Sequence, residues 1–502
     1  MLYLNLKADE KGFSYFILAV ALALQVFVSI YGFGFSEDAY VHAEIARVVA
    51  NNPIYPASYE PLAPVQFTYP PLFHYFSLVP YFFTHDFLLA VNIVGYSAVV
   101  IFPLAMFFVG SLFGLRVAAF SALFSVIISS FARVYFFGEF PQVLATVLLS
   151  FSFYFYVKRR YYVSGTFLGL VSLSHAFIGP FSYVMALFLL AIDFVKKNFS
   201  AFKLLVPAVA LSSFWLLRYS LIVLNAFHSE WNNVVNYSAY PGVISLAIFS
   251  EYLINAVNPV LLLLSFVGMF FVIKAILAKG FSAPKHYFGL LFLFLTTFSF
   301  TIYHFPPFQL KMLDLLTIPV VLGAAIAVDR SLSLVLNQKR SFLIAAAVLF
   351  ALFIAASFML GPIRTINDYK AQKFHIPEEV KQAALFLEGY DKNLSRIIVV
   401  DEYRRYGKSE LIVSRLSGKL PLDAVISDLE SYSPEYQQRL SDRQKIISFF
   451  NSDSANSGNA KMEAAASTAA LLQKYGIRYV FARNCVLGEA IFRDAAVSVC
   501  QV

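Results

Sequence analysis

The chain has 502 residues, of which 59% are hydrophobic, 17% aromatic and only 14% charged, and its mean hydropathy is +0.69. Soluble globular proteins carry about 25% charged residues, so this composition excludes that class and predicts that most of the chain lies in a bilayer. The formal net charge of +8 is not gathered into one basic face, which argues against a nucleic-acid partner and for membrane lipids as the surroundings.

Long apolar segments follow one another from the N-terminus to about residue 361. A membrane-spanning helix needs about 20 mostly apolar residues. The candidates are 13–35, 88–113, 117–136, 140–157, 161–179, 180–195, 204–224, 258–278, 286–304, 308–328 and 341–361. They predict a polytopic α-helical membrane domain over residues 1–363 with about 11 spanning helices. No small-residue cleavage site clearly follows the first segment, so we expect a retained helix rather than a signal peptide.

The basic residues predict how these segments are oriented. With the N-terminus in the cytoplasm, 15 of the 19 Lys and Arg residues before position 364 fall in cytoplasmic loops. Only Arg47, Arg133, Arg218 and Lys311 fall on the other side. Because cytoplasmic loops are enriched in Lys and Arg, we expect a multi-pass protein of the cell membrane with a cytoplasmic N-terminus and an extracytoplasmic C-terminus.

The composition changes after Pro362, and the tail 364–502 predicts a small α/β domain outside the membrane. Proline and two acids at 376–379 are typical of a helix start. Buried-strand patterns stand at 396–400 and 477–481, and the second follows an Ala-rich helical stretch, 463–474. Strands that alternate with helices favour this fold class.

The chain has two cysteines, Cys485 and Cys500, both in this tail. An oxidising exterior would allow a disulfide between them, whereas two buried free thiols are the alternative. Their separation in the sequence does not decide between the two.

The acidic pair Glu37-Asp38 comes directly after the first apolar segment, at the start of a long outer loop, 36–87. One interpretation is a cap on a surface helix over 38–50, because a helix N-terminus favours negative charge. The other is a general base, or a carboxylate that binds a divalent cation, at the membrane surface. A capped carboxylate is also a positioned one, so the two interpretations are compatible.

Further candidate residues map to the same side of the membrane. Glu139, alone in an apolar outer turn, is a candidate catalytic or metal-binding acid, and pairing with Arg133 is the alternative. His42 stands four residues after Asp38 and would share its helix face. His42 and His175 are candidate substrate-binding residues and, with carboxylates, candidate ligands of a divalent ion; hydrogen bonding at the interface is the alternative.

Two outer cations, Arg218 and Lys311, lie near helix ends. One interpretation is that their side chains reach toward lipid head groups. The other is that they contact the phosphate of a lipid-linked substrate, and for Lys311 we favour this one.

Several of these motifs together resemble the GT-C class of membrane glycosyltransferases, which includes oligosaccharyltransferase catalytic subunits and protein O-mannosyltransferases. The motifs are Glu37-Asp38-Ala39-Tyr40-Val41-His42 after the first helix, Tyr69-Pro70-Pro71, Glu139 in the second outer loop, Lys311 ahead of Leu-Leu-Thr-Ile-Pro, and the strand Lys-Tyr-Gly-Ile-Arg-Tyr-Val near the C-terminus. The similarity in architecture extends over nearly the whole chain.

The resemblance implies transfer of a sugar from a polyprenyl-phosphate-linked donor to a saccharide, lipid or protein acceptor at the outer membrane face. It implies Asp38 or Glu37 as base, and Asp38 with Glu139 as ligands of Mg²⁺ or Mn²⁺ if a metal takes part. Lys311 would hold the donor phosphate. The remaining expected substrate-binding residues are Arg218, His42, His175 and Tyr69.

The sequence departs from the class at two points. The second outer loop has one acid rather than an Asp-x-Asp pair, and the tail lacks the Trp-Trp-Asp signature of oligosaccharyltransferases. These departures argue against transfer to an asparagine sequon and leave metal dependence open. A transporter or flippase for lipid-linked saccharides, and a non-catalytic membrane assembly subunit, are the competing interpretations.

Overall fold

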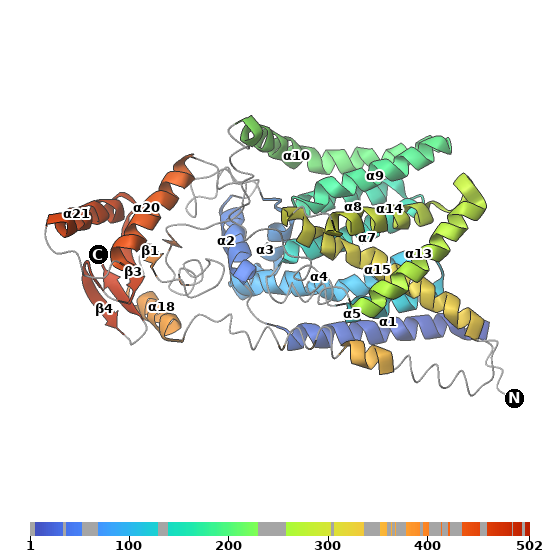
Figure 1. The fold of residues 1–502 in the computed structure, drawn as a ribbon, viewed down its shortest axis with the longest axis horizontal. Helices are drawn as coiled ribbons and strands as arrows, with labels where there is room; N and C mark the ends of the chain where they lie inside the picture. Colours follow the sequence, from blue (N-terminus) through green and yellow to red (C-terminus); the bar gives the residue numbers. More distant parts are fainter. Residues whose placement is uncertain are drawn as a thin grey trace.

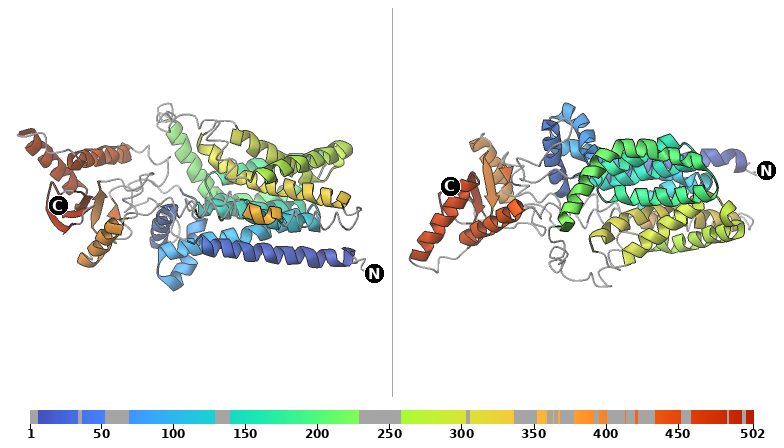
Figure 2. Two further views of the ribbon diagram at one scale, coloured as in Figure 1. Left: turned by 60° about the horizontal axis from the view of Figure 1, so that its bottom comes forward. Right: turned by 90° about the horizontal axis from the view of Figure 1, so that it is seen from above.

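A computed structural model describes the protein over residues 6–33, 37–52, 69–128, 139–228, 258–302, 306–335, 352–358, 378–391, 395–400, 434–451, 459–483, 485–493 and 497–502, with single residues 363, 367 and 413 and the pair 420–421. Figure 1 shows an elongated molecule with a bundle of helices and, beyond one end of it, a smaller part built of a sheet and helices. The chain enters the bundle at the end far from this sheet, as the two views in Figure 2 also show.

Long apolar helices build the bundle, because a backbone in a bilayer must satisfy its hydrogen bonds within the spanning segment. They are α1 (Leu6–Tyr31), α4 (Phe87–Gly110), α5 (Leu115–Ile127), α7 (Phe140–Val157), α8 (Tyr161–Ser174), α9 (Ile178–Val195), α10 (Leu205–His228), α13 (Pro259–Lys279), α14 (Lys285–Ile302) and α15 (Pro306–Val335). Short 3₁₀ helices, Phe199–Leu204 and Gly280–Ser282, link some of them. Two further helices, α2 (Glu37–Asn51) and α3 (Leu72–Thr84), lie at one end.

Seven helical segments in the described part of the chain are long and apolar enough to cross a membrane. They are Glu10–Tyr31, Phe87–Gly110, Phe140–Val157, Ile178–Val195, Phe199–Leu217, Pro259–Ser282 and Leu315–Ser333. Each overlaps an expected span, and the fold class of a polytopic helical membrane protein is confirmed.

The expected count of about 11 spans is not confirmed. Helices α5 and α8 have 13 and 14 residues, which correspond to about 20 Å of helix against a hydrocarbon core of about 30 Å. Of the expected span 341–361, the structure describes 352–358. The sequence pattern overestimated the length of α8, which ends at Ser174 rather than at residue 179, because apolar residues continue into the turn that follows it. Residues 129–136 of the expected span 117–136 lie outside the described residues.

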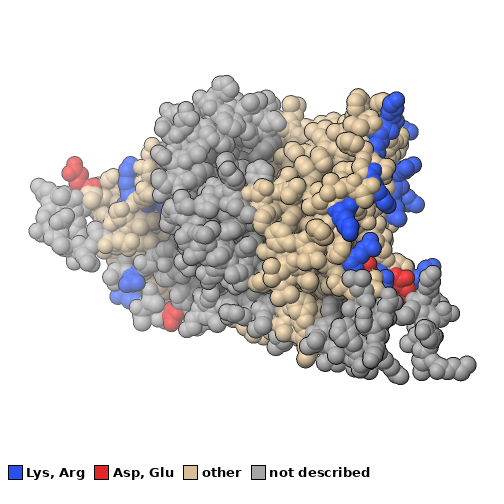
Figure 3. Space-filling view, turned by 45° about the vertical axis from the view of Figure 1, so that its right-hand side comes forward, with Lys and Arg blue, Asp and Glu red and all other residues tan. Residues whose placement is uncertain are grey.

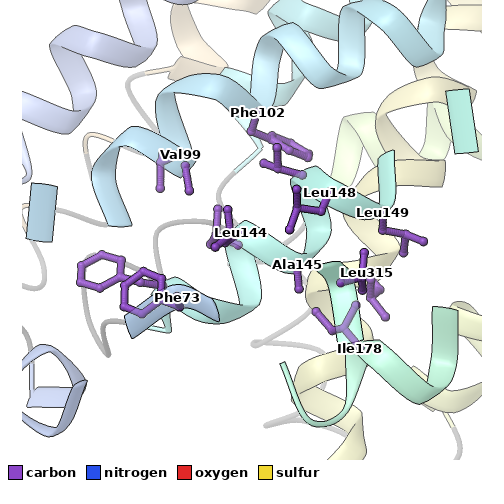
Figure 4. Close-up of a cluster of buried hydrophobic side chains, with 14 of the residues drawn as sticks. Phe73, Val99, Phe102, Leu144, Ala145, Leu148, Leu149, Ile178 and Leu315 are labelled. Atoms are coloured by element: carbon purple, nitrogen blue, oxygen red, sulfur yellow. The ribbon is translucent and has the colours of Figure 1, made fainter. Parts of the chain in front are cut away.

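The core of the bundle lies between α4, α7, α9 and α15. Figure 4 shows side chains that meet there, among them Phe102 of α4, Leu148 of α7, Ile178 of α9 and Leu315 of α15. These side chains are buried. Phe73 of α3 is fully buried at one end of this cluster, so the short helix is joined to the bundle by packing as well as by the chain.

Helices α13 and α15 cross at glycines. A Cβ atom placed on Gly268 would lie 1.9 Å from the carbonyl oxygen of Gly323. On the other side, a Cβ atom on Gly323 would lie 3.0 Å from the Cα atom of Ser265. Small residues let helix backbones approach in a bilayer, where apolar side chains gain little by leaving lipid for protein, so this contact depends on close packing.

The end of the bundle far from the sheet is basic. Figure 3 shows Lys and Arg side chains gathered on it. Among the basic residues of the expected cytoplasmic loops are Arg116 at the start of α5, Lys158 after α7 and Lys196 after α9. The expected grouping of these loops on one side of the membrane therefore corresponds to one physical end of the bundle.

A buried ion pair joins α9 and α14 at this basic end. Lys285 Nζ of α14 lies 3.1 Å from Asp193 Oδ2 of α9, and the Asp193 side chain is 4% exposed. The same ammonium lies 4.2 Å from the ring centre of Tyr156 and 5.1 Å from that of Tyr161. Tyr156 donates its hydroxyl to Asp193, and Asn198 Nδ2 donates to Asp193 Oδ1 at 2.9 Å. A buried charge needs such partners to be tolerated.

The C-terminal part contains a mixed five-stranded sheet with the order β2-β1-β3-β5-β4. Its strands are β1 (Arg396–Val399), β2 (Leu420–Pro421), β3 (Ile477–Ala482), β4 (Glu489–Arg493) and β5 (Ser498–Gln501), and its helices are α18 (Glu378–Tyr390), α20 (Pro434–Asn451) and α21 (Asn459–Lys474). Strand β1 pairs in parallel with β2 and β3, whereas β5 is antiparallel to β3 and β4. The strands and helices expected around 396–400, 477–481, 376–379 and 463–474 are confirmed.

Cys485 and Cys500 form a disulfide, which decides between the two alternatives left open by the sequence. Cys500 lies in β5, and Cys485 lies in the connection from β3 to β4. The disulfide therefore links strand β5 to the loop between β3 and β4.

Asp442 joins α20 to the end of α21. Its carboxylate is 3% exposed and accepts hydrogen bonds from Lys474 Nζ at 2.8 Å and Tyr475 Oη at 2.9 Å. Gln438 and Lys445 of its own helix donate to the other oxygen. Burial alone would raise the pKa of Asp442, but these four donors outweigh it and lower the pKa below its ordinary value.

Replacing this carboxylate, Asp442→Asn, should lower the free energy of unfolding of the sheet region by about 1–3 kcal/mol at neutral pH, since Lys445 and Lys474 lose the opposite charge and an NH2 donor replaces one acceptor oxygen. A lowered folded-state pKa stabilises the fold above the ordinary value of about 3.9, and this stabilisation is lost as the pH falls through the folded value. The variant should therefore lose less stability on acidification than the wild type.

Hydrogen exchange of the β3 amides in the full-length protein, corrected for the intrinsic pH effect, measures the free energy of unfolding at neutral pH and its loss on acidification. Glu463→Gln on the exposed side of α21 is the matched control and should leave exchange unchanged. Equal acid sensitivity of Asp442→Asn and wild type would contradict the assignment.

Candidate active site at the α2–α3 end of the bundle

The end of the bundle nearest the sheet carries the candidate site residues. Helices α2 and α3 lie there (Figure 1), and α4 and α7 begin there. Helices α4 and α7 run away from it toward the basic end, where Lys158 follows α7. Asp38, Glu139 and His175 therefore come to one end of the molecule, as the alternation of spans predicted.

Asp38 lies in the first turn of α2 and is partly buried. A carboxylate in the first turn interacts favourably with the positive end of the helix dipole. The backbone of Glu37 opens the same helix, whereas its side chain lies outside the described residues. Both interpretations of the acidic pair, cap and catalytic carboxylate, place Asp38 at this helix start.

Helix α2 is more deeply buried than the surface helix expected from its sequence. Ala39, Ala43, Ile45 and Ala46 are 0% exposed. The small alanines allow α2 to pack closely against α3 and α4. Local periodicity predicted the helix correctly, but its burial depends on elements distant in the chain.

A pair of buried histidines joins α2 to α3. The Nδ1 atom of His42 lies 3.2 Å from Nε2 of His74, and the two residues are 5% and 0% exposed. The ring of Tyr69 meets both imidazoles edge-on, with ring centres 5.5 Å from His42 and 5.4 Å from His74. Phe73 packs against His42 in the same way, at 5.6 Å.

Glu139 immediately precedes α7, whose second residue is Pro141. Proline is favoured in a first helical turn because its missing N–H is not needed there. The next side chain, Phe140, stacks on Phe73 of α3 with ring centres 6.2 Å apart. Phe140 is fully buried, and a Cβ atom on Gly95 of α4 would lie 2.2 Å from its ring. The backbone at Glu139 is thus held in place by the buried ring of the next residue, Phe140.

His175 connects α8 to α9 and is buried. Its Nδ1 accepts hydrogen bonds from the backbone N–H groups of Phe177 and Ile178, both at 3.2 Å, and so caps α9. An accepting Nδ1 leaves Nε2 as the protonated nitrogen of the ring. The structure therefore gives this residue a local role, beside which its expected contact with substrate stays a prediction.

The two expected phosphate-binding cations lie on helices of the bundle. Arg218 belongs to α10 and Lys311 to α15, but both side chains lie outside the described residues. Their contact with a substrate stays a prediction.

The expected metal ligands Asp38 and Glu139 both lie in the described part of the chain. No group of three or more His, Cys, Asp or Glu side chains suited to a metal ion occurs among those residues. Binding of a cation by Asp38 and Glu139 stays a prediction, and we derive no metal-dependent step from these acids.

The sequence interpretation missed one charged pair in this region. Glu44, whose side chain is 3% exposed, forms an ion pair with Arg47 on the next turn of α2. The spacing of three residues with opposite charges is the signal that could have revealed it. Burial of Glu44 could not have been inferred, because it depends on the packing of α2 within the end of the bundle.

Comparison with solved structures identifies the fold. The oligosaccharyltransferase of Archaeoglobus fulgidus, solved with Zn and sulfate, matches 93% of this chain and 67% of its own, at 14% identity and a TM-score of 0.55. ArnT from Cupriavidus metallidurans in the apo state matches 97% of both chains, at 14% identity and a TM-score of 0.55. ArnT bound to undecaprenyl phosphate matches 97% of both chains, at 12% identity and a TM-score of 0.53.

The chain has the GT-C fold. The expectation drawn from the short motifs is confirmed at this level, over nearly the whole length of the chain. No protein-family model and no curated protein matches the sequence. At 12–14% identity the likeness establishes the fold and leaves the reaction to be argued from the site.

Proposed function

We propose that the protein is a glycosyltransferase that moves a sugar from a polyprenyl-phosphate-linked donor to an acceptor at the outer face of the membrane. The observation that carries the proposal is the location of Asp38: a partly buried carboxylate in the first turn of α2, a helix that packs against α3 and α4, in a chain with the GT-C fold. Asp38 acts as the general base that removes a proton from the acceptor hydroxyl or amine as the sugar is transferred.

The donor class is supported by chemistry and by one comparison. A polyprenyl chain is insoluble in water, so its transferase needs apolar helices beside polar groups at the interface, and this chain has both. One of the ArnT structures with the same fold contains undecaprenyl phosphate. Arg218 and Lys311 are the cations we assign to the donor phosphate.

The orientation proposed is a cytoplasmic N-terminus and an extracytoplasmic sheet. The basic end of the bundle supports it, because Lys and Arg favour the cytoplasmic side (Figure 3). The disulfide between Cys485 and Cys500 supports it independently, since such bonds persist in oxidising compartments. Chemical labelling of the 158–160 turn from outside intact cells would contradict this orientation.

Transfer from radiolabelled polyprenyl-phosphate sugars by the purified protein in liposomes tests the function. Asp38→Asn should reduce transfer at least about 100-fold, because the base is lost while the first turn of α2 keeps a polar side chain of the same size. Asp86→Asn is the matched control: Asp86 caps α4 at the same end through its Oδ1, and an asparagine oxygen can replace it. This control should retain transfer.

The other outcomes of this assay separate the competing functions. Movement of the intact labelled lipid across the bilayer without transfer would favour a flippase, and near-normal transfer by Asp38→Asn would reject the proposed base. Repeating the assay with EDTA decides whether a divalent cation bound by Asp38 and Glu139 takes part.

A further inference from the structure

We propose that the hydrogen bond between His42 and His74 is a joint that positions Asp38 relative to Glu139. The inference rests on the proposed function, since it assigns these two acids to one site. His42 and His74 are then positioning residues that act through the helices they join. This differs from the expectation that His42 contacts substrate, because 5% exposure and a bond to a second buried ring suit a structural contact better.

The first link in this joint is local. Asp38 and His42 are four residues apart on α2 and lie one above the other on one helix face. Side chains of a helix lean toward its N-terminus, so the His42 ring lies over the turn that carries Asp38. Any rotation of α2 that turned Asp38 away from the site would also move this ring.

The second link crosses to α3. An imidazole pair at 3.2 Å needs one ring to donate and the other to accept. At least one of the two rings must therefore be uncharged, because a charged imidazolium has no nitrogen that can accept. Burial, and next the nearby His42, hold the pKa of His74 well below its ordinary value, with the Pro70 backbone opposing them. An uncharged His74 is thus the state at neutral pH, and the hydrogen bond can persist there.

The third link leads from α3 to the second acid. Phe73, the neighbour of His74 in the chain, stacks on Phe140 at 6.2 Å, and Phe140 directly follows Glu139. Phe73 and Phe140 are both 0% exposed. A continuous set of buried contacts therefore runs from the turn of Asp38, through the histidine pair, to the residue beside Glu139.

The hydrogen bond contributes what apolar packing cannot. Alanine contacts between α2 and its neighbours are non-directional and tolerate small rotations of the helix. A buried hydrogen bond is directional, and breaking it leaves a buried polar nitrogen without its partner, which is costly. The histidine pair therefore selects one rotation of α2, and with it one direction for Asp38.

The two bonded nitrogens define a sharp test. The side-chain amide of asparagine occupies nearly the position of Nδ1 in histidine, and the amide of glutamine nearly that of Nε2. His42→Asn combined with His74→Gln should therefore rebuild the joint without either ring. The exchanged pair, His42→Gln with His74→Asn, has the same composition but places its amides at the wrong positions.

Each variant is assayed for sugar transfer in liposomes as above, together with His74→Leu. We expect His74→Leu and the exchanged pair to lose about 10- to 100-fold in kcat with the KM for donor changed less than about threefold, since a misplaced acid slows the reaction without weakening binding. The rebuilt pair should stay within about fivefold of wild type. Ser77→Ala, which removes another buried polar group of α3 bonded within its own helix, should match wild type.

Hydrogen exchange of the α2 amides gives a readout independent of activity. It should become faster in His74→Leu and in the exchanged pair, and stay at the wild-type rate in the rebuilt pair. Equal turnover and equal exchange in all variants would overturn the joint while leaving the transferase intact. Absence of transfer by wild type would instead overturn the proposed function, and the exchange rates would still decide whether the histidines join the two helices.

Discussion

A valine in place of Gly268 should prevent α13 and α15 from packing, and little folded protein should survive extraction into detergent. The added side chain begins with a Cβ atom that would lie 1.9 Å from the carbonyl oxygen of Gly323 and 2.6 Å from its carbonyl carbon. These are backbone atoms of α15 and cannot rotate away, so the whole helix has to move. Overpacking costs about 1–3 kcal/mol where side chains can adjust, and we expect a larger loss here.

Size-exclusion profile and thermal unfolding of the extracted protein measure this effect. Val267→Leu, at the neighbouring position that is 47% exposed, adds a methylene group without a close neighbour and is the matched control. A monodisperse Gly268→Val protein with an unchanged unfolding temperature would show that the glycine contact is dispensable.

Alanine in place of Gly95 should remove most of the transferase activity while the bundle still assembles. Its methyl group would lie 2.2 Å from Cγ and Cδ1 of Phe140, so the ring has to shift. Because Phe140 follows Glu139 and stacks on Phe73, the shift displaces one acid of the proposed site relative to the other. A displacement of about 1 Å can lower a rate by about 100-fold.

Turnover and thermal unfolding of Gly95→Ala separate the two expected effects, and we expect a loss of stability of about 1–3 kcal/mol from overpacking. The double variant Gly95→Ala with Phe140→Ala is the informative control, because alanine lacks the Cγ and Cδ1 atoms that would overlap. Adding Gly95→Ala to Phe140→Ala should therefore cost no further stability. A Gly95→Ala protein with wild-type turnover would show that the position of Phe140 does not affect the reaction.

The sequence predicted those elements of the fold whose signals are local. Helix α7 has a proline in its first turn and basic residues directly after its end, and its expected and observed limits agree at 140–157. The strand at 477–482 follows a glycine with a φ of +63°, a backbone conformation that glycine adopts readily. Neither assignment needs knowledge of a distant contact.

The candidate site was predictable to the same extent. That Asp38 and His42 share one helix face follows from their spacing alone. That His42 bonds to His74 does not, because 32 residues separate the two rings. In the same way, Glu139 was recognisable from the sequence as a lone acid. The packing of its neighbour Phe140 against Gly95 was not, because these two residues belong to different helices. Contacts between helices decide both, and no local pattern encodes them.

The ion pair at the basic end has a consequence for biosynthesis. Asp193 and Lys285 are 92 residues apart, so α9 leaves the ribosome well before α14 has been made. Until then, Tyr156 and Asn198 are the partners that can donate hydrogen bonds to the Asp193 carboxylate at the membrane surface. Tyr156 precedes Asp193 in the chain, and Asn198 follows it by five residues. Formation of the ion pair between α9 and α14 is therefore a late step in assembly, completed only after the insertion of α14.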